Sequence, residues 1–161
     1  MRFIITDTVL ETPHVIVGAA IAIKVVNPAL ALPLAFGSHF LLEKIPHWNP
    51  HLNSELKKFG KITNKSTKII ILDASCALVI GSYLSSLVLP NLSYALTIFF
   101  SCFLSVLPDL VEAPYFFLNY RNKKIDKWIG FQKVMQENAS LLPGLFSQLL
   151  VVFAALWWIS V

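Results

Sequence analysis

Charged residues are scarce in this chain. Only 14% of its 161 residues are Asp, Glu, Lys or Arg, whereas 56% are hydrophobic. A soluble domain carries roughly 25% charged residues, so this chain has too little charge to cover a surface that faces water. The composition therefore excludes an ordinary water-soluble domain and predicts an integral membrane protein, with residues 1–161 forming one domain.

Cysteine is nearly absent as well. Cys76 and Cys102 lie in separate apolar segments, so we expect two small buried hydrophobic residues, and nothing requires a disulfide. A cleaved signal peptide is not expected, because Asp7 and Glu11 precede the first apolar run. The net charge is only +4 and comes from two lysine-rich segments. This pattern indicates membrane topology and gives no sign of nucleic-acid binding.

Long apolar runs dominate the rest of the chain and predict an all-α fold, a bundle of about five transmembrane helices. The expected helices are residues 13–26, 29–46, 67–89, 92–119 and 141–160. The first would be about 21 Å long, which is short for a hydrocarbon core of about 30 Å. The polar segments 49–68 and 120–133 are expected to be loops. Trp157 and Trp158 at the end of the last helix are typical of a membrane interface.

The orientation follows from the two basic segments. Two membrane crossings separate them, so both must lie on one side, and the excess of lysine and arginine places that side in the cytoplasm. The expected arrangement is multi-pass, with the N-terminus in the cytoplasm and the C-terminus outside.

Three of the four histidines fall within residues 35–51. His39, Glu43 and His47 are spaced i, i+4, i+8, which places them roughly on one face of a helix. Pro46 indicates that this helix ends or distorts just before His47. Neutral imidazoles and carboxylates together are typical ligands of a divalent metal. The alternative is a helix end that carries polar residues facing water.

Ionisable residues of other helices are expected at the same level of the membrane. They are His14 in the first helix, Asp73 in the third, and Asp109 and Glu112 in the fourth. A lone carboxylate at such a depth costs at least about 2.5 kcal/mol on insertion scales, and several together repel one another unless a cation compensates. A divalent metal would supply that charge, zinc in the first place and manganese or magnesium as alternatives. A network of protonated acids and histidines is the other explanation.

The sequence thus predicts a metal centre and a set of catalytic candidates. The expected metal ligands are His14, His39, Glu43, His47, Asp73 and Asp109. The candidates for a general base are Asp73, Glu43 and Glu112, with Glu112 in or beside the ligand set. The remaining ionisable residues are expected to be solvated: His51, Asp7, Glu11, Glu55, Asp126 and Glu137.

Four short motifs resemble a known family. They are T-P-H-x-x-x-G from Thr12 to Gly18, S-H-F-L-L-E-K-I-P-H-W from Ser38 to Trp48, the intramembrane Asp73, and L-P-D-L-x-E from Leu107 to Glu112. Together they resemble the small membrane-bound metal-dependent hydrolases, a group that includes the LexA-regulated inner-membrane hydrolase family of bacteria. The resemblance spans residues 12–118.

That resemblance implies a His/Asp metal centre, hydrolytic activity and a place in the bacterial inner (cytoplasmic) membrane. The chain departs from the family pattern at Glu43 and Asn49, where aspartates are expected, so Asn49 is not counted as a ligand. No histidine follows residue 128. We therefore expect every ligand to come from the first four helices.

Three functions fit these residues. A hydrolase would act at the cytoplasmic interface on a phosphoester or ester of an amphiphilic substrate such as a phospholipid, whose headgroup the basic segments would attract. An ion or proton transporter would use the same acids and histidines as a relay. A structural membrane protein would use them to lock its helices together. The outer halves of the last three spans carry no group that titrates near neutrality, which favours a one-sided site over a transport route.

Cysteine labelling from outside the cell tests the topology. A cysteine placed at Asn91 should be modified by a membrane-impermeant reagent, and one placed at Lys61 should be protected, because the positive-inside rule places the basic segments in the cytoplasm. Labelling at position 61 without labelling at position 91 would overturn the orientation.

Overall fold

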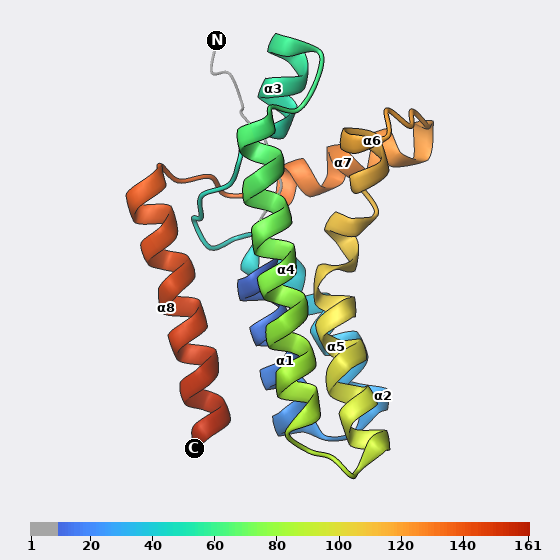
Figure 1. The fold of residues 1–161 in the computed structure, drawn as a ribbon, viewed down its shortest axis with the longest axis vertical. Coiled ribbons are helices and arrows are strands. Elements are labelled where there is room, and N and C mark those ends of the chain that lie inside the picture. Colours follow the sequence, from blue (N-terminus) through green and yellow to red (C-terminus); the bar gives the residue numbers. More distant parts are fainter. Residues whose placement is uncertain (1–9) are drawn as a thin grey trace.

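The computed structural model describes residues 10–161, and this part of the chain forms eight helices and no strand (Figure 1). The five longest are α1 (Glu11–Val25), α2 (Pro28–Leu42), α4 (Asn64–Ser86), α5 (Leu92–Leu110) and α8 (Leu141–Ser160). The shorter helices α3 (Leu52–Phe59), α6 (Ala113–Phe117) and α7 (Lys123–Met135) gather at one end of the molecule. The predicted all-α fold is confirmed.

Helix α1 is the centre of the bundle, since it packs against α2, α4, α5 and α8. Its side chains are small where the neighbours approach, at the buried residues Gly18, Ala19, Ala20 and Ala22. A Cβ atom added at Gly18 would lie 2.8 Å from the Ser101 carbonyl oxygen and 2.8 Å from the Ser105 hydroxyl of α5. Small residues spaced four apart let helix backbones approach closely in membranes, and α1 and α5 meet in this way.

Three helices, α4, α5 and α8, are long and apolar enough to span a membrane. Large hydrophobic side chains point outward along α4 and α8, among them Leu72, Val79, Phe153 and Trp157. An outer surface of this kind suits lipid and not water. The chain therefore has the features of a membrane protein, as its composition predicts.

The expectation of about five spanning helices needs a correction. Helices α1 and α2 have 15 residues each, which makes them about 22 Å long, well short of a hydrocarbon core of about 30 Å. A short first helix was expected, but α2 was expected to reach residue 46 and ends at Leu42. A turn at residues 43–45 and Pro46, which cannot donate a helical hydrogen bond, account for the early end.

Other boundaries differ from the sequence expectation too. The segment 92–119 was expected as one helix interrupted by Pro108, but Pro108 lies inside α5 and the helix ends at Leu110. Helix α6 follows, with Pro114 at its first turn, where proline is favoured. The two basic segments are not simple loops, because they contain α3 and α7. They do lie at the same end of the molecule (Figure 1), as their separation by two crossings requires.

One residue-level expectation, the burial of Cys76, is also corrected. Cys102 is buried as expected, but Cys76 is exposed on the outer face of α4, and both are free thiols. Asp7 lies outside the described residues.

Replacing Gly18 by alanine tests the central packing of the bundle. The added methyl group meets the α5 backbone, so the free energy of unfolding should fall by about 1–3 kcal/mol, the usual cost of overpacking. Gly37→Ala in α2 is the matched control, because a Cβ atom there meets nothing within 4 Å. Thermal unfolding of the detergent-purified protein measures both variants. Equal melting temperatures for the two would contradict the packing described.

Candidate metal centre

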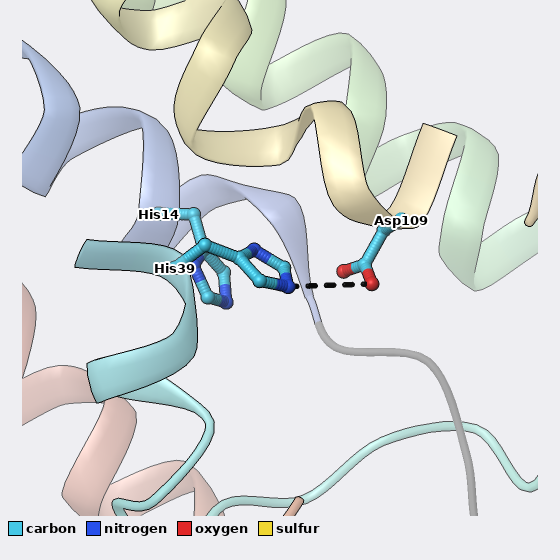
Figure 2. A group of neighbouring side chains, drawn as sticks. All are labelled: His14, His39 and Asp109. Carbon is cyan, nitrogen blue, oxygen red and sulfur yellow. Dashed lines mark ion pairs between the residues drawn. The ribbon is translucent and has the colours of Figure 1, made fainter. Parts of the chain in front are cut away.

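Three buried side chains from three different helices converge near the end of the bundle that carries the basic segments. They are His14 of α1, His39 of α2 and Asp109 of α5, and each offers a ligand atom within 4.8 Å of the other two (Figure 2). The Nε2 atom of His39 lies 3.7 Å from Oδ1 of Asp109. The two imidazole rings stack with their centroids 4.5 Å apart. This group can hold a metal ion.

The orientation of His39 is fixed by the backbone of α5. Its Nδ1 atom lies 2.9 Å from the carbonyl oxygen of Ser105. A carbonyl oxygen can only accept a hydrogen bond, so Nδ1 carries the proton and Nε2 keeps its lone pair toward Asp109. A histidine that ligates a metal usually donates its other ring N–H in this way, which fixes the tautomer and the ring orientation.

Glu43 extends the group beyond the three ligands. It follows directly after α2, and its Oε1 atom lies 3.6 Å from Nε2 of His14. The side chain is only 2% exposed. Glu43 and His39 are one turn apart, as the sequence spacing predicts, and both contact His14.

His47 lies outside the helix in a segment held from two sides. Its backbone N–H donates to the Glu137 carbonyl, and its own carbonyl accepts from Ala139. Its Nδ1 atom lies 2.6 Å from the Ile45 carbonyl oxygen, so this ring is also protonated at Nδ1. Its buried Nε2 atom has no hydrogen-bond partner in the described part of the chain. His47 therefore presents a free Nε2 atom, whereas Nε2 of His39 has a polar neighbour, the amide of Gln132.

Buried polar atoms are left unsatisfied throughout this cluster. Within residues 10–161 no hydrogen-bond partner exists for Nδ1 of His14, Oε1 of Glu43, Nε2 of His47, Oδ2 of Asp109 or Oε1 of Glu112. Buried polar groups almost always have a partner, and an exception needs an explanation such as an ion or a water molecule. A divalent cation accepts lone pairs from all these atom types except a protonated nitrogen. The residues present therefore fit a metal.

Glu112 belongs to the same electrostatic environment. It is 4% exposed, and it follows Asp109 by three residues, as expected. Burial, together with the nearby Glu43 carboxylate, raises the pKa of Glu112 to about 8. Asp109 in turn lies within electrostatic range of Glu11, Glu43 and Glu112. Acidic groups held this closely favour a cation among them.

Asp73 occupies a different position from the histidines. Its Oδ1 atom accepts a hydrogen bond of 2.6 Å from the Thr12 hydroxyl, and its Oδ2 atom accepts one from the backbone N–H of Glu11. Leu10, the N-cap residue of α1, provides no side-chain cap. Asp73 supplies that cap from α4, which stabilises a helix start. The structure does not bring it into the group formed by His14, His39 and Asp109.

Two residues of the site are absent from the sequence prediction. Gln132 of α7 reaches into the centre, where its Nε2 atom lies 3.2 Å from Nε2 of His39 and donates to Oδ1 of Asp109 over 3.1 Å. Glu11 was expected to be solvated, yet it is half-buried, and its Oε2 atom is buried without a partner among residues 10–161. The only sequence signal for Glu11 was its place beside the Thr12-Pro13-His14 motif.

The position of Gln132 depends on α7, a helix in a segment that was expected to be a loop. Trp128 of α7 donates from its indole N–H to the carbonyl oxygen of Pro108, 3.0 Å away. Trp128 and Phe131 also pack edge-on against Phe40 of α2. These contacts hold α7 across the end of α2 and α5, which places the Gln132 amide between His39 and Asp109.

The remaining polar candidates lie at the edge of the cluster or away from it. Asn49 is 1% exposed, and neither of its amide atoms has a hydrogen-bond partner within the described chain. His51 is exposed at the start of α3, as expected. Glu55 is half-buried instead of solvated and accepts hydrogen bonds from Thr63 and Ser66.

Comparisons with protein-family models, with curated proteins and with solved structures give no match for this chain. The class that the fold and the site define is therefore a helical membrane protein with a buried group of two histidines and one aspartate that can hold a metal ion.

Metal analysis of the purified protein tests this site. We expect stoichiometric divalent metal in the wild type and none in the His39→Ala, Asp109→Ala double variant, because two of the three converging ligands are lost. His51→Ala is the control, since this histidine lies outside the cluster, and it should keep its metal. Stoichiometric metal in the double variant would show that the ion is bound elsewhere.

Proposed function

We propose that this chain is a membrane-embedded, metal-dependent hydrolase that cleaves a phosphoester or ester of an amphiphilic substrate. The observation that carries the proposal is the buried group of His14, His39 and Asp109, which lies beside carboxylates whose oxygens have no partner among residues 10–161. The motif resemblance to small membrane-bound metal-dependent hydrolases supports the same reaction class.

His14, His39 and Asp109 would hold the metal, and zinc suits two imidazoles and one carboxylate best. Manganese and magnesium are alternatives that the neighbouring carboxylates would favour. A divalent cation held there supplies Lewis-acid chemistry, since it polarises a substrate oxygen and makes water a stronger nucleophile at neutral pH. The hydrogen bond from His39 to the Ser105 carbonyl keeps the ligand nitrogen aimed at this position.

Glu43 and Glu112 are the residues best placed to move a proton. In hydrolysis, the water oxygen forms a bond to phosphorus or to the acyl carbon, and the bond from that atom to the leaving oxygen breaks. The water proton passes to a carboxylate, and the leaving oxygen takes up a proton. Oε1 of Glu43 and Oε1 of Glu112 are both buried without a partner in the described residues. A cation bound beside them would lower the raised pKa of Glu112, and either carboxylate could then accept that proton.

Asp73 is a weaker candidate for the proton acceptor than the sequence alone indicates. Both of its oxygens accept hydrogen bonds from the first residues of α1, so neither is free to take a proton from water. We assign Asp73 to positioning, because it fixes the start of the helix that carries His14.

The location of the site suits a lipid substrate at a membrane face. The cluster lies toward the end of the bundle where α3, α7 and the first turns of α4 carry lysines of the two basic segments (Figure 1). Basic segments at a membrane surface attract anionic headgroups. By the positive-inside rule this face is cytoplasmic, and the motif resemblance favours the bacterial inner membrane. The proposed partners are the bilayer and the amphiphilic substrate.

A second candidate function is a structural polar lock without catalysis. The observation in its favour is Gln132, whose amide contacts both His39 and Asp109 and so occupies the place of a bridging cation. Added zinc distinguishes the two functions. A metal centre binds zinc only when folded, so zinc should raise the melting temperature of both the wild type and Gln132→Leu. A polar lock predicts that Gln132→Leu unfolds at a lower temperature and that zinc changes neither protein.

The proposed activity is tested with headgroup-bearing lipids and alkyl phosphoesters, each with Zn²⁺, Mn²⁺ and Mg²⁺ in turn. We expect turnover that depends on added metal, and we expect Glu43→Gln or Glu112→Gln to lower kcat by about 100- to 10,000-fold, the usual contribution of a general base. Metal content should stay stoichiometric in the affected variant.

Asp73→Asn serves as the comparison variant in this assay. It should lower the melting temperature, because asparagine cannot accept both hydrogen bonds at the start of α1, while the kcat of the folded protein is largely kept. If both glutamine variants left a confirmed activity unchanged, the assigned proton acceptors would be wrong. Metal bound without turnover of any of these substrates would favour the structural lock.

A further inference from the structure

A second feature of the fold lies outside the metal centre, between α4 and α5. A cavity of about 200 Å³ opens there on the outer face of the bundle, with the buried Val15 of α1 among its lining residues. On α4 it is lined by a stripe at positions 74, 77, 78, 81 and 82, where four of the five residues are Ala, Gly or Ser. On α5 the lining includes Phe99, Phe103 and Val106. We call this the α4–α5 groove.

The two ends of the groove differ in chemistry. Most of its lining is apolar, from Phe99 and Ser82 along to Leu110. At the Leu110 end it also meets Glu11, whose Oε2 atom is buried without a hydrogen-bond partner in the part of the chain that is described. An apolar channel that ends at an unpaired carboxylate is unlike a simple gap between two lipid-facing helices.

The groove continues into the polar cluster. A second cavity, of about 90 Å³, shares Glu11, Ala74 and Leu110 with it. That second cavity is also lined by Asp73 and by Asp109, one of the three candidate metal ligands. The two cavities therefore adjoin, and the second one reaches Asp109 at the edge of the metal centre.

The dimensions of the α4–α5 groove limit the class of molecule that it can hold. Ala74 and Ser82 are eight positions apart on α4, which corresponds to about 12 Å along the helix. A partner helix is about 10–12 Å in diameter and does not fit between two helices that already contact each other and enclose about 200 Å³. An extended alkyl chain fits such a space.

We propose that the α4–α5 groove binds one alkyl chain of an amphiphile whose polar group lies at Glu11, Asp73 and Asp109. This inference rests on the proposed function for the identity of the polar group, an ester or phosphoester next to the metal. The groove indicates the substrate class, an amphiphile of which one alkyl chain enters the groove sideways from the bilayer. Burial of each CH₂ group contributes about 0.8 kcal/mol, so chain length should control affinity.

The test uses a dodecyl phosphate that carries a photoreactive diazirine at the end of its chain, added to the full-length protein in lipid nanodiscs. Mass spectrometry of the peptides then locates the label. We expect saturable labelling of the peptide with Phe99 and Phe103, competed by unlabelled dodecyl phosphate but not by inorganic phosphate. Octyl phosphate should compete more weakly than dodecyl phosphate.

Two substitutions test whether the groove is responsible. Ala74→Phe should abolish saturable labelling, because Ala74 is exposed and lines the junction between the two cavities. Ser82→Phe fills the far end of the groove, and it should move the label to another peptide or abolish the saturable labelling. Ala154→Phe on the exposed face of α8 is the matched control and should leave labelling unchanged. Loss in all three variants would point to a folding defect and overturn the assignment to the groove.

The outcome separates this inference from the proposed function. Labelling that does not saturate and that is equal on the exposed Phe153 of α8 would overturn the groove, whatever the metal analysis shows. Saturable labelling that is lost when the metal is chelated supports both proposals, since phosphate is repelled by bare carboxylates. Saturable labelling that is indifferent to the metal supports the groove and contradicts the metal-dependent role of the site.

Discussion

The close approach of α1 and α5 is the constraint on which the rest of the structure depends. Gly18 leaves no room for a side chain against Ser101 and Ser105, so the two helices meet backbone to backbone. This contact brings His14 of α1 within reach of Asp109 of α5. It also exposes the Ser105 carbonyl to His39 of α2. One serine therefore takes part both in the helix packing and in the orientation of a candidate metal ligand.

Burial of polar groups in an apolar bundle favours a cation bound within the cluster. Each unsatisfied buried polar group costs about 1–3 kcal/mol, and within the described chain five residues of the cluster carry one: His14, Glu43, His47, Asp109 and Glu112. Gln132 satisfies one lone pair of His39 and one of Asp109, but it reaches none of the free atoms of Glu43, His47 and Glu112. A cation satisfies carboxylate and imidazole lone pairs together. The same argument explains why Asp73, whose oxygens are already paired, belongs to the helix start.

Much of this arrangement follows from sequence patterns that have a direct physical interpretation. The scarcity of charge predicts the apolar helices, and the placing of ionisable residues at one level predicts that His14, His39, Glu43, Asp109 and Glu112 lie close together. The i, i+4 spacing predicts that His39 and Glu43 lie one helical turn apart on the same face. Pro46 predicts the loss of helix before His47, and α2 ends at Leu42, whose carbonyl would be the helical acceptor for the N–H that Pro46 lacks.

Other features depend on tertiary contacts that a single sequence does not encode locally. Helix α7 lies in a basic segment with no strong apolar run, and only its contacts through Trp128 and Phe131 place Gln132 in the site. Asp73 looks like a catalytic carboxylate because its own helix offers it no partner. Its partners, Glu11 and Thr12, lie about sixty residues away in sequence. Glu11 is expected to be solvated on similar grounds, because the residues that surround it are also distant in sequence.

X-ray absorption at the zinc edge, measured on the zinc-loaded protein, tests the central claim most directly. The account predicts a first shell of nitrogen and oxygen donors at about 2.0–2.2 Å, with the outer-shell scattering of two imidazoles from His14 and His39. His39→Ala should remove the contribution of one imidazole. A first shell without imidazole scattering, or zinc that washes away during purification, would contradict a metal centre at this position.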